Sequence, residues 1–282
     1  MNQRIFSILL VLALLLSGCA AQKSVPSADI LATTAPMAQI VGAITAGTEL
    51  TVATLISEPV SCVHDYALSV DQMRAVESAH LVVISGAGLE EFMGDALASC
   101  EAVIDASEGL ELLPGEEEYD PHTWLAPENM IAMTRTVETA LAAEYPQHAA
   151  LFAENADVWC EKLEALQAYG EQQLASLSCR KLVTFHDGFA YFAQAFDLEI
   201  AASMEIEAGS EPSARELEEI ISLLQDQGIP AVFTEINGTA DAAELVARET
   251  GCAVFSLDTA ISSVNYLSAM TQNIDTIKEA LG

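Results

Sequence analysis

Eight short apolar runs fall into two groups of four, and they limit the possible folds of this chain more than any other feature. Each run has four to seven residues, and stretches with helical periodicity lie between them. Apolar strands that alternate with helices are typical of parallel sheets covered on both faces. We expect strands at 29–33, 50–56, 81–85 and 102–105, and again at 182–185, 199–202, 231–234 and 253–257. The grouping predicts an α/β protein with two lobes, each a four-stranded parallel sheet flanked by helices.

The interval between the two groups is helical. A stripe of apolar residues predicts a helix over 127–141, and Pro146 ends it. Residues 147–177 then contain no proline and a single glycine, Gly170. One helix of this length would extend about 45 Å and join the lobes as a rigid spine. A helical hairpin inserted between the lobes is the alternative. A closing helix is expected at 268–281.

The N-terminus has the features of an export signal. Arg4 precedes an apolar run at 5–16 that is too short to span a membrane stably. The sequence Leu16-Ser17-Gly18-Cys19 resembles a lipobox, so we expect Cys19 to be lipidated and to anchor the chain to a bacterial cell membrane on its extracytoplasmic side. An ordinary cleaved signal peptide is the alternative. The expected division is a signal peptide at 1–18, a tether at 19–28, an N-terminal lobe at 29–146, the spine helix at 147–178 and a C-terminal lobe at 179–282.

The charge of the chain is strongly negative, with 42 acidic and 10 basic residues and a net charge of −32. Such a surface repels nucleic acid and attracts cations. Solubility explains most of this charge without a specific partner. We expect a monomer that binds no nucleic acid.

Five cysteines remain besides Cys19: Cys62, Cys100, Cys160, Cys179 and Cys252. Export permits disulfides, and an odd number leaves at least one thiol free. The first two cysteines belong to the same lobe, so we favour a pairing of Cys62 with Cys100. No CxxC spacing indicates a cysteine zinc site.

Three histidines and one aspartate follow the ends of predicted strands. His64 comes after the second strand and His122 after the fourth, while His186 and Asp258 directly follow the strands at 182–185 and 253–257. Ligands of open parallel sheets bind beyond the carboxyl ends of the strands. Two candidates from each lobe would therefore converge where the lobes face each other. Three imidazoles and a carboxylate suit Zn²⁺.

Each of these residues alone is weak evidence, because a single histidine or aspartate after a strand is usually an ordinary loop or capping residue. The other two histidines do not fit the pattern. His80 precedes a strand, at the opposite edge of a parallel sheet, and His148 lies at the start of a predicted helix.

Five stretches of the chain resemble the cluster A-I, or family 9, substrate-binding proteins of ABC transporters for zinc and manganese. They are 63–66 (VHDY), 81–89 (LVVISGAGL), 120–125 (DPHTWL), 184–192 (TFHDGFAYF) and 256–259 (SLDT). The resemblance implies two lobes joined by one long helix, with the metal between them. Carried over by position, the metal ligands are His64, His122, His186 and Asp258.

The resemblance also indicates which metal is bound. Family members with glutamate at the third ligand position are associated with manganese, and those with histidine there with zinc. A third imidazole in place of a carboxylate makes a site less suited to an oxygen-preferring ion. His186 therefore favours Zn²⁺ over Mn²⁺.

The chain departs from the family pattern in two places. Many zinc-binding relatives carry a long loop rich in His and Asp before the second histidine, whereas this chain has a short acidic loop at 114–120 (PGEEEYD). That loop could attract metal or simply be solvated. The family's LDP at the last ligand is Leu257-Asp258-Thr259 here, so the loop around Asp258 lacks the family's proline. Glu235, after the seventh strand, could support the site.

The function implied is an extracytoplasmic receptor, not an enzyme, which captures Zn²⁺ and delivers it to an ABC transporter permease with its ATPase. A manganese receptor is the alternative within the family. A zinc hydrolase could also use three histidines and a carboxylate, but the chain has no HExxH motif. An adhesin lipoprotein with a structural metal is a third possibility.

Overall fold

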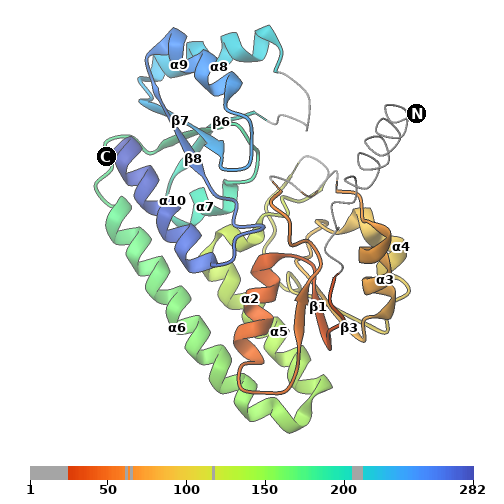
Figure 1. Cartoon of the computed structure of the whole chain (residues 1–282). Coiled ribbons are helices and arrows are strands. Elements are labelled where there is room, and N and C mark those ends of the chain that lie inside the picture. The colour runs from red at the N-terminus through yellow and green to blue at the C-terminus, as the bar shows by residue number, and fades with distance from the viewer. Residues whose placement is uncertain (1–24, 61–62, 64–65, 116–117, 205–211) are drawn as a thin grey trace, which may run out of the picture.

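The chain forms two α/β lobes joined by a long helix (Figure 1). The computed structural model describes residues 25–60, 63, 66–115, 118–204 and 212–282. Within these ranges each of the eight expected strands is present, with ends within two residues of the predicted ones. None of the helices found there is long and apolar enough to cross a membrane.

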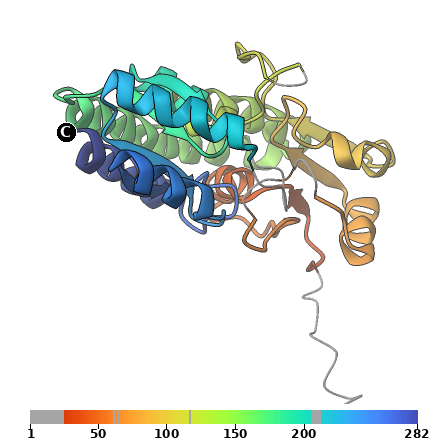
Figure 2. The same cartoon turned by 90° about the horizontal axis from the view of Figure 1, so that it is seen from above.

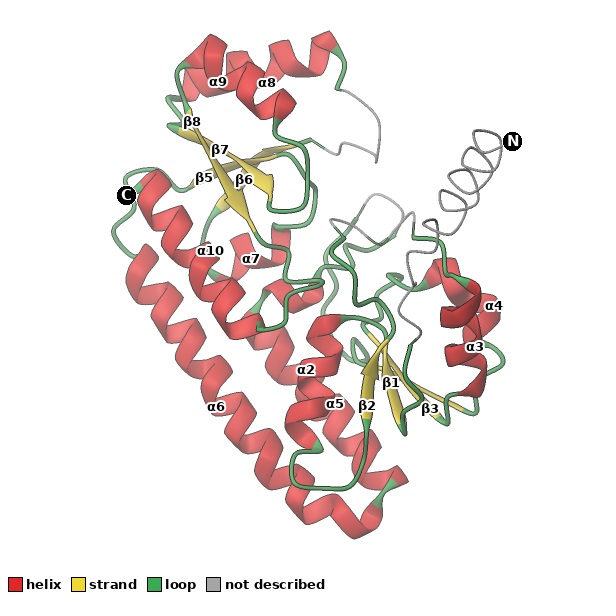
Figure 3. Ribbon diagram, in the orientation of Figure 1, coloured by secondary structure: helices red, strands yellow, loops and turns green. Residues whose placement is uncertain are grey.

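The N-terminal lobe contains a parallel sheet with strand order β2-β1-β3-β4. Its elements are β1 (Ile30–Ala32), α2 (Ala35–Ile44), β2 (Val52–Thr54), α3 (Val70–Ser78), β3 (Leu81–Ile84), η1 (Glu91–Met93), α4 (Gly94–Leu97), β4 (Ala102–Asp105), η2 (Thr123–Leu125) and α5 (Pro127–Glu144). Figure 3 shows α2 and α5 on one face of the sheet and α3 and α4 on the other. Because helices cover both faces, neighbouring residues such as Val82 and Val83 are both buried.

The C-terminal lobe repeats this plan with strand order β6-β5-β7-β8, again parallel. Its elements are β5 (Lys181–Thr184), α7 (Ala190–Ala195), β6 (Glu199–Ser203), α8 (Ala214–Gln227), β7 (Ala231–Glu235), α9 (Asp241–Thr250), β8 (Ala253–Leu257) and α10 (Tyr266–Leu281). In Figure 3, α8 and α9 lie on one face of the sheet, with α7 and α10 on the other. A capping box of Ser213 and Glu216 begins α8, and Gly228, with a φ of 62°, ends it.

The connection between the lobes is a single helix and not a hairpin. A short turn of 3₁₀ helix, η3 (Pro146–His148), leads into α6 (Ala149–Leu174), whose 26 residues extend about 39 Å. This helix contacts α2 and α5 of the first lobe and α10 of the second, and Figures 1 and 2 show α10 alongside it. Gly170 allows the close approach of the C-terminal lobe, since a Cβ there would lie 2.2 Å from Cε1 of Phe196.

A buried carboxylate joins the carboxyl ends of β1 and β3. Glu90 Oε1 accepts hydrogen bonds from Thr33 Oγ1 at 2.6 Å and from the backbone N–H of Ser85 at 2.7 Å, and Oε2 accepts one from Gly86 at 3.0 Å. Desolvation raises the pKa of Glu90 to about 6, although these hydrogen bonds oppose the shift. The protonated form is therefore favoured more strongly in the folded protein than in the unfolded chain.

This shift predicts a pH dependence of stability that one substitution removes. A pKa raised from 4.5 to about 6 gives stability that is complete below pH 4.5 and is lost as the pH rises through 6. The loss amounts to about 2 kcal/mol. Glu90→Gln cannot titrate. The difference in unfolding free energy between the metal-free wild type and this variant should fall by about 2 kcal/mol between pH 4 and pH 7.5, measured by urea denaturation.

The neighbouring exposed Glu91 provides a control for the same substitution. Glu91→Gln should give a stability profile parallel to that of the wild type across this pH range. Parallel profiles for the wild type and Glu90→Gln would show that the charge of Glu90 is not destabilised by burial.

Candidate metal centre

Two of the predicted ligands meet between the lobes. His122 follows β4 at the start of η2, and His186 follows β5, yet their Nε2 atoms lie 3.2 Å apart. The ring centroids are 5.0 Å apart and the rings are nearly perpendicular, at 87°. Both side chains are buried. The predicted convergence of one histidine from each lobe is therefore present.

The separation of these nitrogens is close to that of two ligands on one tetrahedral zinc ion. With Zn–N distances of about 2.0–2.1 Å, a tetrahedral angle places two ligand nitrogens about 3.3–3.4 Å apart. The observed Nε2–Nε2 distance is 3.2 Å. A small displacement of the two rings would admit a metal ion between them.

Asp120 orients the first of these histidines. Its Oδ1 accepts a hydrogen bond from the backbone N–H of His122 at 2.9 Å and lies 2.8 Å from Nδ1 of the same residue. A carboxylate can only accept, so Nδ1 carries the proton and Nε2 presents its lone pair toward His186. The sequence analysis considered Asp120 only as the last residue of the acidic loop at 114–120 and not as a partner of His122. The sequence feature that could have indicated this partner is an acidic residue two positions before a candidate ligand, with Pro121 between them.

A carboxylate also approaches the second histidine. Glu235 ends β7, and its Oε1 lies 3.4 Å from Nε2 of His186. The side chain is buried like the two imidazoles. Glu235 was expected to support the site, and the geometry places it against the nitrogen that faces His122, close enough to contribute a ligand itself.

Gly188 lies directly against the pair. A Cβ at this position would lie 2.7 Å from Nε2 of His186 and 3.0 Å from Nε2 of His122. The chain bends at 185–187, and α7 begins only at Ala190, with Phe189 in its N-cap position. Asp187, which directly follows His186, therefore does not cap this helix.

Asp258 directly follows β8, as predicted, but its carboxylate is engaged within its own loop. Oδ1 accepts a hydrogen bond from the N–H of Ala260 at 2.8 Å, and Oδ2 accepts one from Ser263 Oγ at 2.5 Å. Asn273 also binds both the N–H and the carbonyl of Asp258. These bonds fix the loop without the family's proline. Each carboxylate oxygen accepts one hydrogen bond and keeps a second lone pair that could bind a metal.

Several expectations concern residues outside the described ranges, namely the ligand His64, the signal peptide and lipidated Cys19, the paired Cys62 and the middle of the acidic loop, 116–117. Among the described residues alone, no group of three His, Cys, Asp or Glu side chains is arranged to hold a metal ion. The candidate set therefore includes His64 on the sequence argument only.

The proposed pairing of Cys62 with Cys100 is not formed. Cys100 is a free cysteine, and its Sγ lies 3.5 Å from the carbonyl oxygen of Val76, while Cys62 lies outside the described residues. His80 lies away from the site, as expected from its position before β3. It contacts Glu101 and Glu144 on the surface at 2.9 and 2.8 Å.

The sequence is similar to those of known metal-binding proteins. The sequence matches the family described as the periplasmic zinc-uptake complex component A over residues 30–280. The manganese-binding lipoprotein MntA of Bacillus subtilis is 30% identical over 249 residues, which cover 83% of this chain and 81% of MntA. The zinc-binding protein TroA of Treponema pallidum is 28% identical over 239 residues, covering 77% of this chain and 78% of TroA.

The fold also matches a solved structure. The crystal structure of ZnuA superposes on this chain with a TM-score of 0.82 at 26% identity, and the match covers 91% of this chain and 100% of ZnuA. The two lobes and the helix between them are thus an arrangement found by experiment in a similar protein.

The hydrogen bond between Asp120 and His122 predicts a graded effect on metal affinity. Asp120→Ala removes the acceptor that orients the ring, and loss of such a partner typically lowers metal affinity about 10- to 100-fold. Asp120→Asn keeps an acceptor oxygen without the charge, so its loss should be smaller. Competition titration of Zn²⁺ against a chromophoric chelator measures both. Glu118→Ala, which removes an exposed acid from the same segment, should bind as the wild type does. Equal affinities for Asp120→Ala and the wild type would rule out this role.

Proposed function

The chain belongs to the family of the zinc-uptake complex component A, and on this basis we propose that it is an extracytoplasmic receptor that captures Zn²⁺ between its two lobes. The observation that supports this most directly is the pair of buried imidazoles, His122 and His186, with Nε2 atoms 3.2 Å apart. One imidazole comes from each lobe. Metal bound there would tie the lobes together.

The proposed first ligands of Zn²⁺ are His64, His122 and His186, with a carboxylate from Asp258 as the fourth. Glu235 is the alternative carboxylate, because its Oε1 lies 3.4 Å from His186 Nε2. Four protein ligands leave no open position for a substrate or a reactive water, which suits sequestration and not catalysis. We therefore propose a transport receptor and no enzyme activity.

Zinc is the proposed cargo because imidazole nitrogens dominate the ligand set. Mn²⁺ prefers carboxylate, carbonyl and water oxygens, whereas imidazole suits zinc. Manganese is the second candidate, favoured by the 30% identity to the manganese-binding MntA. The choice between zinc and manganese depends on residue 186, because a carboxylate there in place of the imidazole would add an oxygen ligand, which Mn²⁺ prefers.

The proposal includes a membrane anchor and a partner. MntA is named a lipoprotein, and this chain carries the lipobox-like sequence that ends in Cys19. We propose lipidation there, on the extracytoplasmic side of the bacterial membrane, and delivery of the metal to an ABC permease with its ATPase. Because protons compete for the imidazole nitrogens, metal affinity should fall as the pH drops through about 6.

Metal titration of the mature chain tests this function. The wild type should bind one Zn²⁺ and prefer it to Mn²⁺ by at least about 10-fold. His186→Ala and His122→Ala remove a ligand each and should lower zinc affinity by at least about 100-fold. Isothermal titration calorimetry on chelator-stripped protein gives these constants. His186→Glu should shift the preference toward Mn²⁺.

His80→Ala is the matched control, because His80 lies on the surface and outside the proposed site. Its zinc affinity should equal that of the wild type. Tight zinc binding that survives His186→Ala would refute the proposed site, and a wild type that binds Mn²⁺ more tightly than Zn²⁺ would refute the choice of cargo.

A further inference from the structure

The segment between β8 and α10 belongs to the C-terminal lobe by sequence but is bound to the N-terminal lobe. We call residues 259–266, which include Tyr266 as the first residue of α10, the crossover loop. Its Ile261 carbonyl accepts a hydrogen bond from the N–H of Ala35 at 3.2 Å, where α2 begins. Gln39 of α2 donates to the carbonyl of Ser263 at 3.0 Å and accepts from the N–H of Tyr266 at 2.6 Å. The crossover loop is thus attached along its length to the opposite lobe.

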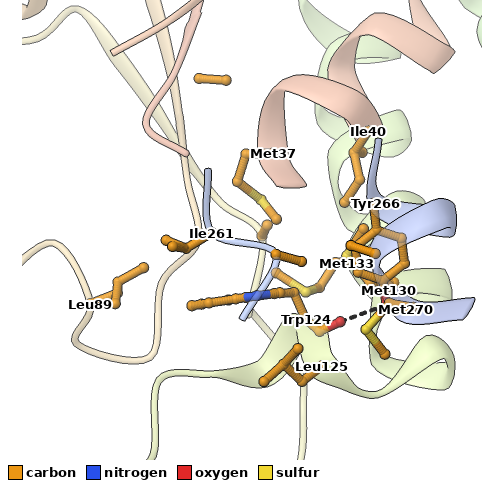
Figure 4. Close-up of a cluster of buried hydrophobic side chains, with 14 of the residues drawn as sticks. Met37, Ile40, Leu89, Trp124, Leu125, Met130, Met133, Ile261, Tyr266 and Met270 are labelled. Carbon is orange, nitrogen blue, oxygen red and sulfur yellow. Dashed lines mark hydrogen bonds between the residues drawn. The ribbon is translucent and has the colours of Figure 1, made fainter. Parts of the chain in front are cut away.

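Trp124 joins the two ends of this loop. Its indole Nε1–H donates to the carbonyl of Thr259 at 2.7 Å, and its own carbonyl accepts a hydrogen bond from the hydroxyl of Tyr266 at 2.7 Å. Figure 4 shows the indole and Tyr266 within a cluster of apolar side chains, with the second bond dashed. Burial raises the pKa of Tyr266 well above its usual range, so the hydroxyl remains protonated and able to donate.

The hydrogen bond of the indole N–H is important for stability because it is buried. Trp124 and Tyr266 both have an exposed fraction of 0%, and Thr259 is buried beside them. In such a position, loss of the donor leaves the Thr259 carbonyl without this partner and costs more than a surface hydrogen bond would. The bond therefore defines where the start of the crossover loop lies relative to η2.

The same indole lies beside one candidate ligand and is hydrogen-bonded to the residue that follows another. The rings of His122 and Trp124 have centroids 5.4 Å apart. Thr259, which accepts the indole bond, directly follows Asp258. Trp124 thus connects a candidate ligand of the N-terminal lobe to one of the C-terminal lobe, although it has no metal-binding atom itself.

We propose that Trp124 is a positioning residue of the metal centre, whose bond to Thr259 holds Asp258 at the correct distance from His122. This inference rests on the proposed function. Trp124 orders the ligands of the two lobes before the metal binds. The free energy needed to order them therefore does not weaken the binding of the metal. Without the indole N–H, zinc still finds its ligands but dissociates sooner.

The two tryptophans of the chain provide a matched pair of variants. Trp124→Phe keeps an aromatic ring and removes the N–H donor. Trp159→Phe makes the same change on the spine helix α6, where the indole Nε1 has no hydrogen-bond partner among the described residues. The zinc dissociation rate is measured by stopped flow with excess chelator. Trp124→Phe should raise this rate about 10-fold, and Trp159→Phe should leave it unchanged.

A double-mutant cycle with Asp258→Ala separates positioning from general destabilisation. If Trp124 acts through Asp258, then Trp124→Phe has little further effect on zinc affinity once the carboxylate is gone, and the two losses do not add. Additive losses would overturn the proposal, as would an Asp258→Ala variant that binds zinc like the wild type. Equal dissociation rates for the two tryptophan variants would overturn it as well.

Tyr266→Phe gives a second measure if Trp124→Phe does not fold, because it keeps the indole and removes the hydroxyl bond at the other end of the crossover loop. Like Trp124→Phe, it should raise the zinc dissociation rate, and an unchanged rate would overturn the proposal. Failure of the proposed function itself looks different, since the wild type would then bind no zinc.

Discussion

The geometry of the candidate site depends on the fixed distance between the two parallel sheets. One continuous helix, α6, packs against α2 and α5 of the first lobe and α10 of the second. The carboxyl ends of both sets of strands consequently face a common space. His122 and His186, which are 64 residues apart, therefore meet with Nε2 atoms 3.2 Å apart. No local feature of the sequence sets this distance; the packing of the lobes against one helix does.

The contacts around this pair divide into those that orient a ligand and those that join the lobes. Asp120 and Glu235 belong to the first kind, because each places a carboxylate beside one of the imidazoles. Trp124 belongs to the second kind, because its indole binds the loop that follows Asp258. The two kinds are adjacent along the chain, since Asp120, His122 and Trp124 are alternate residues of one short segment that leads into η2. A short motif can thereby control both the direction of a ligand and its distance from the other lobe.

The sequence was sufficient to predict the fold because each strand contains consecutive apolar residues and the spine helix contains no proline. It was also sufficient to predict the meeting of His122 and His186, since each comes after a strand and the carboxyl ends of the two sheets face each other. It did not reveal the role of Asp120, which depends on the direction of its side chain. The pairing of Cys62 with Cys100 was wrong because it relied only on the two cysteines belonging to the same lobe, whereas Cys100 is free and its Sγ lies 3.5 Å from the carbonyl oxygen of Val76.

The central claim is that the imidazoles of His122 and His186, one from each lobe, hold a single zinc ion. A crystal structure of the zinc-loaded protein, with anomalous scattering at the zinc edge, tests it most directly. The account predicts one ion bonded to Nε2 of both histidines at about 2.0–2.1 Å. Zinc bound only to other groups, with these two nitrogens uncoordinated, would contradict it.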